Sequence, residues 1–313
     1  MRALIMIFLL VAVVAVLPLF VTSGFAINFV IMVLYATLLG QAWNILGGFG
    51  GQFSFGHAVF FGTGAYAMSV LQVKLGFNAW VALPCAIALG ALVGTLLGAL
   101  SFRYGLKGSY FALVTLAFAE VFRILANTFE FTGAGVGLQL PLQASATSLQ
   151  FATKTGYLYT ILVFVTISLL IAWWLKHSRY GAWLTAVRDN EDSAAALGVN
   201  AFRVKLGAIA ISGALMASGG AFYVQMYRYI DPHIAYGTAI SVEALLAAII
   251  GGMGTIFGPL LGAIVLHVLS ELTRHYIDSA PGVSLIIYGA LLVLIIMFMP
   301  RGIAGLFDRF KKT

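Results

Sequence analysis

The chain has 313 residues, of which 62% are apolar and only 9% charged, and its mean hydropathy is +1.03. A water-soluble domain is about 45–50% apolar and about 25% charged, so this composition excludes a soluble globule as well as the disordered and fibrous classes. The single cysteine, Cys85, excludes an intrachain disulfide, so the composition indicates a chain that folds within a lipid bilayer.

Apolar segments long enough to cross a bilayer recur along the whole chain. At about 20 residues per crossing, we predict an all-α polytopic membrane protein with about ten transmembrane helices in a single domain, residues 1–313. The predicted helices are Ala3–Val21, Ala26–Leu46, His57–Val73, Ala79–Phe102, Ser109–Phe129, Gly156–Leu175, Leu206–Tyr227, Thr238–Ile250, Ile256–Leu272 and Val283–Met299. They lack the strict alternation of apolar and polar residues that barrel strands show. Thr238–Ile250 is short for a crossing, so we expect it to be tilted, broken or re-entrant.

The Lys and Arg residues orient these helices, because basic residues accumulate in the cytoplasmic loops of membrane proteins. With ten crossings and a cytoplasmic N-terminus, twelve of the 17 basic residues fall on the cytoplasmic side, four on the outer side and Arg123 within a helix. An odd number of crossings places the basic C-terminus outside. We therefore expect both termini in the cytoplasm. We interpret the net charge of +7 as a signal that orients the protein in the membrane, rather than as a sign of nucleic-acid binding.

Two glycine-rich segments interrupt the predicted helices, one in each half of the chain: Asn44–His57 and Gly251–Pro259. Backbone groups freed at membrane depth must be satisfied by protein or water, and paired breaks are typical of translocation paths. The alternative is close helix packing, which we favour for the isolated glycines. These are Gly62, Gly64, Gly94 and Gly98. The polar residues at the first break are candidates for lining a path: Asn44, Gln52, Ser54 and His57.

Ionisable side chains within the predicted helices are few. Glu120 and Arg123 lie three residues apart, so they share a helix face and can neutralise each other. Glu243 lies near the outer end of the short helix, and His267, in an apolar segment, is expected to be a packing residue. An ionisable group at membrane depth is costly unless it is paired or wet. Glu120, Arg123 and Glu243 are therefore further path candidates, with a structural ion pair as the alternative for the first two.

One sizeable cytoplasmic segment is predicted at about residues 177–205, and a long outer loop at about 130–155. Within the cytoplasmic segment, Ala186–Asn200 is predicted to form one short helix. Its candidate caps are Asp189, Asn190, Glu191 and Asp192 at the start and Gly198 at the end. Its alanine-rich centre forms a smooth knob that a groove on a partner protein can accept. The alternative is an ordinary loop helix at the membrane interface.

Signatures of catalysis are absent from the sequence. There is no Gly-Lys dipeptide and so no P-loop, no His-Glu dipeptide and so no H-E-x-x-H zinc site, and no G-x-S-x-G nucleophile elbow. We therefore predict no catalytic residue, no metal site and no bound cofactor in this chain. If the protein depends on ATP, another chain must hydrolyse it.

Five segments, in this order, carry a family resemblance: Gly51–Ala58 with Gly62–Tyr66, Tyr110–Glu120, Arg188–Gly198 with Lys205, Gly251–Pro259 and Met299–Leu306. Together they resemble the LivM-type permeases of branched-chain amino acid ABC importers. The resemblance covers most of the chain from about Asn28 onward. Each motif alone is weak, but five motifs in the order of the family are specific.

The resemblance implies a multi-pass subunit of the bacterial inner membrane that transports amino acids, by default leucine, isoleucine and valine. The implied partners are a second, related permease, two cytoplasmic ATP-binding subunits that use the ATP, and a periplasmic substrate-binding protein. The cytoplasmic helix then corresponds to the coupling helix that docks in the ATPase cleft. The residues implied in this contact are Arg188, Asn190, Glu191, Asp192, Ala195, Leu197 and Gly198.

Two alternatives stay open from the sequence. Urea and short amides are carried by similar permeases, so a urea or short-amide permease is the first. An ion-coupled secondary amino acid transporter is the second, and it requires an intramembrane carboxylate that titrates or binds Na⁺. Glu120 and Glu243 are the carboxylates suited to that role.

Overall fold

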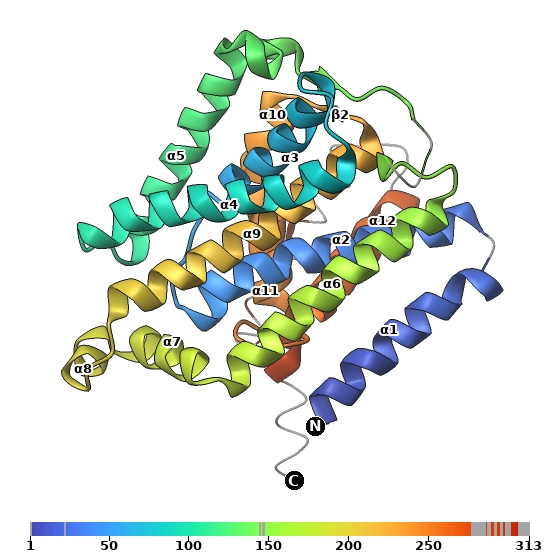
Figure 1. Cartoon of the computed structure of the whole chain (residues 1–313). Coiled ribbons are helices and arrows are strands. Elements are labelled where there is room, and N and C mark those ends of the chain that lie inside the picture. The colour runs from blue at the N-terminus through green and yellow to red at the C-terminus, as the bar shows by residue number, and fades with distance from the viewer. Residues whose placement is uncertain are drawn as a thin grey trace.

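The computed structural model is a bundle of long helices, joined mostly by short connections and by a long one between α5 and α6 (Figure 1). It describes residues 2–21, 23–143, 145, 148–276, 286, 289–290, 293–294, 297 and 302–305. The helices are α1 (Arg2–Phe20), α2 (Gly24–Asn44), α3 (Ala58–Val73), α4 (Ala79–Arg103), α5 (Gly108–Thr128), α6 (Lys154–His177), α7 (Arg179–Asp189), α8 (Glu191–Ala196), α9 (Ala201–Tyr227), α10 (Pro232–Tyr236), α11 (Thr238–Gly251) and α12 (Gly258–Tyr276). The shorter elements are the π-helix η1 (Ile45–Phe49), the 3₁₀-helices η2 (Glu130–Thr132) and η3 (Ala134–Val136), and the strands β1 (Leu138–Gln139) and β2 (Tyr229–Ile230).

The predicted all-α polytopic membrane fold is confirmed. Nine of the ten predicted membrane helices coincide with observed helices to within a few residues. In the described part of the chain, seven segments are long and apolar enough to cross a membrane, and Ala58–Val73 and Gly258–Thr273 are shorter apolar helices. The tenth predicted helix, Val283–Met299, falls almost entirely outside the described residues. The number of crossings and the cytoplasmic side of both termini stay predictions.

The short predicted helix Thr238–Ile250 is one part of a broken crossing. Asp231 caps the five-residue α10, because its Oδ1 accepts hydrogen bonds from the backbone N–H groups of His233 at 2.8 Å and Ile234 at 2.9 Å. Gly237 then adopts an extended conformation and separates α10 from α11. The two helices together give a 20-residue apolar segment, Pro232–Gly251, which is long enough to span.

Small residues bring α9 into close contact with α3 and α4 at the centre of the bundle. A Cβ atom added at Gly64 or Gly94 would overlap the backbone of Ala217 or Ile209 on α9, and one at Gly98 would overlap the Ile209 side chain. A Cβ at Gly62 would overlap the ring of Tyr236 on α10. Close approach of this kind is how membrane helices gain packing contacts without a hydrophobic driving force. The predicted packing role of these four glycines is confirmed.

The bundle has two ends with different elements (Figure 1). At one end β1 pairs with β2 in an antiparallel register, with Leu138 opposite Ile230. At the opposite end lie α7 and α8, which fall in the segment predicted to be cytoplasmic. We therefore refer to these as the outer and inner ends of the bundle.

Candidate translocation and coupling site

The two glycine-rich breaks lie against each other at the inner end of the bundle, and Asn44 joins them. Asn44 is the last residue of α2 and is fully buried. Its Nδ2 donates to the carbonyl oxygen of Thr255 at 3.0 Å, and its Oδ1 accepts from the backbone N–H of Gly254 at 2.8 Å. One side-chain amide therefore supplies the donor and the acceptor that two backbone groups of the second break lack.

A second buried amide, Gln41, reinforces this junction. Its Nε2 donates to the carbonyl oxygen of Ile256 at 2.5 Å, and its Oε1 accepts from Asn44 Nδ2 at 3.2 Å. The sequence analysis missed Gln41. The signal that could have found it is its spacing, because a residue three positions before Asn44 shares its helix face.

Glycine is required where the breaks touch. A Cβ atom at Gly48 would overlap both Asn44 Oδ1 and the backbone nitrogen of Gly254. Gly252 and Gly254 have φ angles of +119° and +70°, which L side chains rarely adopt. The first break begins as the π-helix η1, whose residues are all buried. Close backbone contact and helix unwinding thus occur together at this junction, and whether the breaks also line a path stays a prediction.

The segment predicted to be cytoplasmic contacts this junction through Arg188, in the last turn of α7. Its Nη1 donates to the carbonyl oxygen of Gly48 at 3.1 Å. Its aliphatic stem lies against Gly51, where a Cβ atom would overlap Arg188 Cγ and where the φ of +66° favours glycine. The same guanidinium pairs with Asp189, with 3.0 Å between Nη2 and Oδ1. Arg188 therefore connects the first break with the segment that is predicted to contact a partner.

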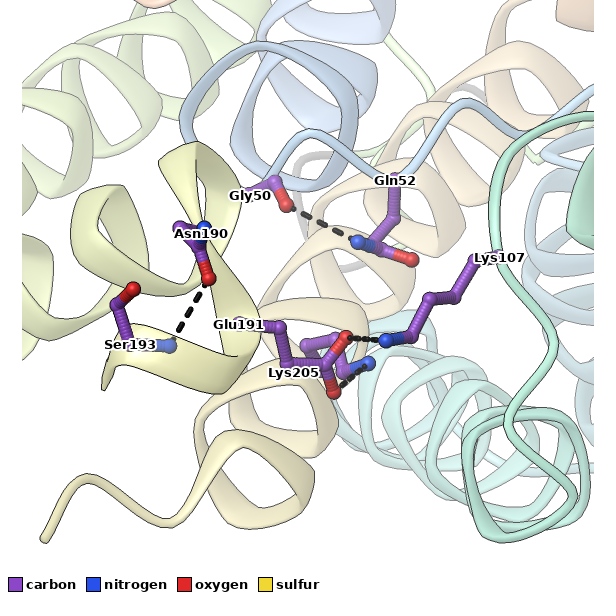
Figure 2. Close-up of polar contacts among 7 residues, drawn as sticks. All are labelled: Gly50, Gln52, Lys107, Asn190, Glu191, Ser193 and Lys205. Carbon is purple, nitrogen blue, oxygen red and sulfur yellow. Dashed lines mark hydrogen bonds and ion pairs between the residues drawn. The ribbon is translucent and has the colours of Figure 1, made fainter. Parts of the chain in front are cut away.

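The prediction of one helix over Ala186–Asn200 is wrong, because Asn190 divides it. α7 ends at Asp189, and Asn190 has φ −157° and ψ 109°, which are incompatible with a continuous helix. Its Oδ1 accepts the backbone N–H of Ser193 at 2.9 Å, so Asn190 is the N-cap of α8 (Figure 2). An asparagine side chain that bonds to a nearby backbone N–H favours a cap over a helix interior. Of the four candidate caps predicted from the sequence, Asn190 is the one that caps α8.

The end of α8 is also as predicted. Gly198 has a φ of +86°, and the backbone N–H of Val199 donates to the carbonyl oxygen of Ala194 at 3.0 Å. This is a glycine-terminated helix end. Ala195 and Ala196 are exposed, Leu197 is 85% exposed, and Ala194 is buried. α8 therefore presents a small apolar knob to its surroundings.

Glu191, the first residue of α8, is held by two lysines (Figure 2). Its Oε1 lies 2.7 Å from the Nζ of Lys205 on α9, and its Oε2 lies 2.9 Å from the Nζ of Lys107, just before α5. Partial burial raises the pKa of Glu191, but the hydrogen bonds from Lys205 and Lys107 outweigh it, so the pKa lies below its usual value. The hydrogen bond to Glu191 likewise raises the pKa of Lys107. Glu191 is therefore ionised at neutral pH.

The remaining candidates of the first break lie in the partly buried loop between η1 and α3. Ser54 and His57 are buried, and His57 Nε2 donates to Ser212 Oγ at 2.9 Å, because that hydroxyl donates to the carbonyl oxygen of Ala42 at 2.6 Å. Ser54 Oγ accepts from the backbone N–H of Gly56. Gln52 is half-buried, and its Nε2 donates to the carbonyl oxygen of Gly50 at 3.3 Å (Figure 2). The hydrogen bonds shown for these three side chains go to Gly50, Gly56 and Ser212, not to the α8 knob.

Glu120 and Arg123 form the predicted ion pair, on the exposed face of α5. Arg123 Nη2 lies 2.5 Å from Glu120 Oε1, and its Nε lies 2.9 Å from Oε2. Arg123 Nη1 also lies 3.4 Å from Nδ1 of His233 on α10. His233 was not predicted, since α10 was not recognised as a helix. These three residues form a polar cluster, which we call the outer cluster.

Glu243 lies apart from both groups. It is half-buried on α11 and faces His267 on α12, with 3.7 Å between Glu243 Oε1 and His267 Nε2. The candidates thus fall into four groups. At the inner end are the junction around Asn44 and the ion cluster around Glu191. The outer cluster and the Glu243–His267 pair lie apart from them. Within the described residues, no group of three or more His, Cys, Asp or Glu side chains is placed to hold a metal ion.

Comparison with known proteins identifies the family. The model of the family described as "Branched-chain amino acid transport system / permease component" matches residues 25–296. The branched-chain amino acid transport permease LivM of Escherichia coli is 31% identical over 91% of this chain and 71% of its own length. The LivH permease of Salmonella typhimurium is 30% identical over 54% of this chain and 52% of its own length. The fructose import permease FrcC of Rhizobium meliloti is 25% identical over 72% of this chain and 64% of its own length.

No solved structure matches the chain significantly. The family match covers all the described membrane helices except α1. It includes both glycine-rich breaks, α8 and the outer cluster. The chain is therefore a multi-pass transport subunit that belongs to the family of branched-chain amino acid transport permeases, of LivM type.

Proposed function

We propose that this chain is the LivM-type subunit of an ATP-driven importer of branched-chain amino acids in a bacterial inner membrane. The observation that carries the proposal is the contact between the α7–α8 segment and the first break at the inner end of the bundle. There the exposed knob of α8 follows Arg188, which contacts the first of the two joined breaks. Movement of α8 by a cytoplasmic partner can reach the membrane-embedded breaks through this contact.

The proposed assembly contains a second, related permease, two cytoplasmic ATP-binding subunits and a periplasmic substrate-binding protein. ATP is bound and hydrolysed by the partner subunits, and this chain needs no cofactor, metal or nucleic acid. Its single domain, residues 1–313, carries the coupling segment at 177–205 and an outer loop at 130–155. The pairing of this chain with a second permease is supported by its relatives, because both LivM and LivH permeases are similar to this chain.

We assign the exposed face of α5 to the translocation path. Exposed residues recur at helical spacing along this face: Tyr110, Leu113, Ala117, Glu120 and Ile124. Glu120 lies twelve residues after the start of α5, about 18 Å along the helix axis. A carboxylate at this depth is costly in lipid, so this face requires a protein partner or water. An amino acid carries one ammonium and one carboxylate group, which complement the Glu120–Arg123 pair.

Ala195→Arg tests the coupling assignment. The bulky charge replaces an exposed alanine in the α8 knob, so we expect it to block docking and abolish uptake, with membrane insertion intact. Leu142→Arg is the matched control, because Leu142 is 69% exposed in the outer loop and remote from α8. Uptake and co-purification with the ATP-binding subunits are measured for both. Normal uptake by Ala195→Arg contradicts the assignment.

Uptake of labelled leucine and labelled urea, with and without this chain in a deletion strain, tests the substrate. We expect leucine uptake to depend on the chain and urea uptake not to. The comparison is needed because the sequence leaves a urea or short-amide permease open as an alternative. Restored urea uptake without leucine uptake favours the short-amide alternative. Uptake that survives ATP depletion but stops when the ion gradient collapses favours an ion-coupled transporter.

A further inference from the structure

The two lysines that hold Glu191 differ in how firmly they are fixed. The side chain of Lys205 is only 2% exposed, and its Nζ lies 5.1 Å from the centre of the Phe102 ring. The side chain of Lys107 is 55% exposed. Lys205 is therefore a fixed anchor for Glu191, whereas the ion pair with Lys107 can break and re-form at little cost.

Lys107 stands at a glycine-flanked entry into α5. Gly105 and Gly108 have φ angles of +67° and +54°, and no neighbouring atom lies within 4 Å of a Cβ built on either residue. Two left-handed glycines in open space are typical of a hinge, because their backbone is unrestrained by packing. Lys107 is the N-cap residue of α5, so its position sets where the helix begins.

α5 is loosely attached to the rest of the bundle. Of the most apolar 18-residue stretch of α5, 28% is buried, whereas 72% of the corresponding stretch of α9 is buried. Figure 1 shows α5 inclined away from the neighbouring helices. A helix with few buried contacts and a glycine hinge can move as a unit. Its outer half carries Glu120 and Arg123, which the proposed function places on the translocation path.

We propose that Lys107 is a positioning residue that links α8 to α5 through Glu191. The inference rests on the proposed function, since it takes the motion of α8 to come from the ATP-binding partners. Lys205 holds Glu191 at the start of α9, and Lys107 passes the displacement of α8 to the first turn of α5. α5 then turns about Gly105 and Gly108, and the outer cluster moves with it.

The test uses the complete importer in proteoliposomes, with transport and ATP hydrolysis measured together. Lys107→Gln is expected to lower the number of leucine molecules transported per ATP by about two- to fivefold, the range that loss of one exposed ion pair gives. Lys107→Arg keeps the charge and is expected to retain the ratio. Arg103→Gln is the matched control. Arg103 is also exposed and is also predicted to be cytoplasmic, but it does not take part in the ion pairs of Glu191.

Labelling of α5 supplies a readout that a merely structural role of Lys107 would not change. A cysteine at the exposed position Ala117, with Cys85 replaced by serine, is labelled by a maleimide with and without trapped ATP. We expect ATP to change the labelling rate in the parent and in Arg103→Gln, and this change to be lost in Lys107→Gln. An unchanged transport ratio together with an unchanged ATP effect in Lys107→Gln overturns the inference.

The two proposals fail differently. If Ala195→Arg transports normally, the coupling role of α8 is wrong and the inference falls with it. If Ala195→Arg abolishes uptake while Lys107→Gln keeps both the ratio and the ATP effect, only the link to α5 is wrong.

Discussion

Asn44→Ala is expected to destabilise the protein by about 2–5 kcal/mol, among the largest effects of any single substitution here. Among the residues that the structure describes, the substitution removes the one side-chain partner of the backbone N–H of Gly254 and of the carbonyl of Thr255. Both groups belong to a half-buried, unwound segment, so each bears a desolvation cost when it loses its partner. The free energy of unfolding, measured by titrating the detergent-solubilised protein with SDS, checks the prediction.

Two further variants show whether the effect arises from the junction. Gln41→Leu removes the hydrogen bond to Ile256 and leaves the Gly254 bond in place, so we expect an intermediate loss. Asn127→Ala, at an exposed position near the end of α5, is expected to change stability by less than about 0.5 kcal/mol. If Asn44→Ala unfolds at the same SDS concentration as Asn127→Ala, Asn44 does not hold the breaks together.

The helices of this fold could be predicted from the sequence because the bilayer demands long apolar segments. α4 was predicted at Ala79–Phe102 and observed at Ala79–Arg103, and comparable agreement holds for α3 and α5. The broken crossing was harder, because α10 contains Pro232 and His233 and has no apolar run of its own. Its helical form depends on the Asp231 cap and on packing that hydropathy does not measure.

The site was predicted in part. Charge spacing indicated that Glu120 and Arg123 could pair, and cap preferences included Asn190 among four candidate caps. The contact of Asn44 with Gly254 joins residues 210 positions apart, and no local pattern encodes such a partner. Lys107 and Lys205 were likewise counted as loop charges, since only the fold brings them to Glu191. Local sequence patterns indicated candidates such as Asn44 and Asn190, whereas partners that are distant in the sequence, such as Gly254, are seen only in the tertiary structure.

Arg188→Met is expected to reduce leucine uptake roughly tenfold while ATP hydrolysis by the assembled importer continues. The substitution keeps the aliphatic stem against Gly51 but removes the hydrogen bond to the carbonyl oxygen of Gly48. A hydrogen bond from a charged donor is worth about 1.5–3 kcal/mol, and 1.4 kcal/mol corresponds to a factor of ten. Because α8 keeps its knob, docking persists and the loss falls on the transmission of movement to the first break.

Arg203→Met is the matched control for this variant. Arg203 is also an exposed, basic residue of the predicted cytoplasmic side, and the hydrogen bond shown for it, to Asn200, uses its backbone N–H, which methionine retains. It is therefore expected to leave both uptake and hydrolysis near those of the parent. Equal uptake by Arg188→Met and Arg203→Met contradicts the role of Arg188. Loss of hydrolysis together with uptake in Arg188→Met shows instead that the residue acts in docking, and that α8 communicates with the breaks by another route.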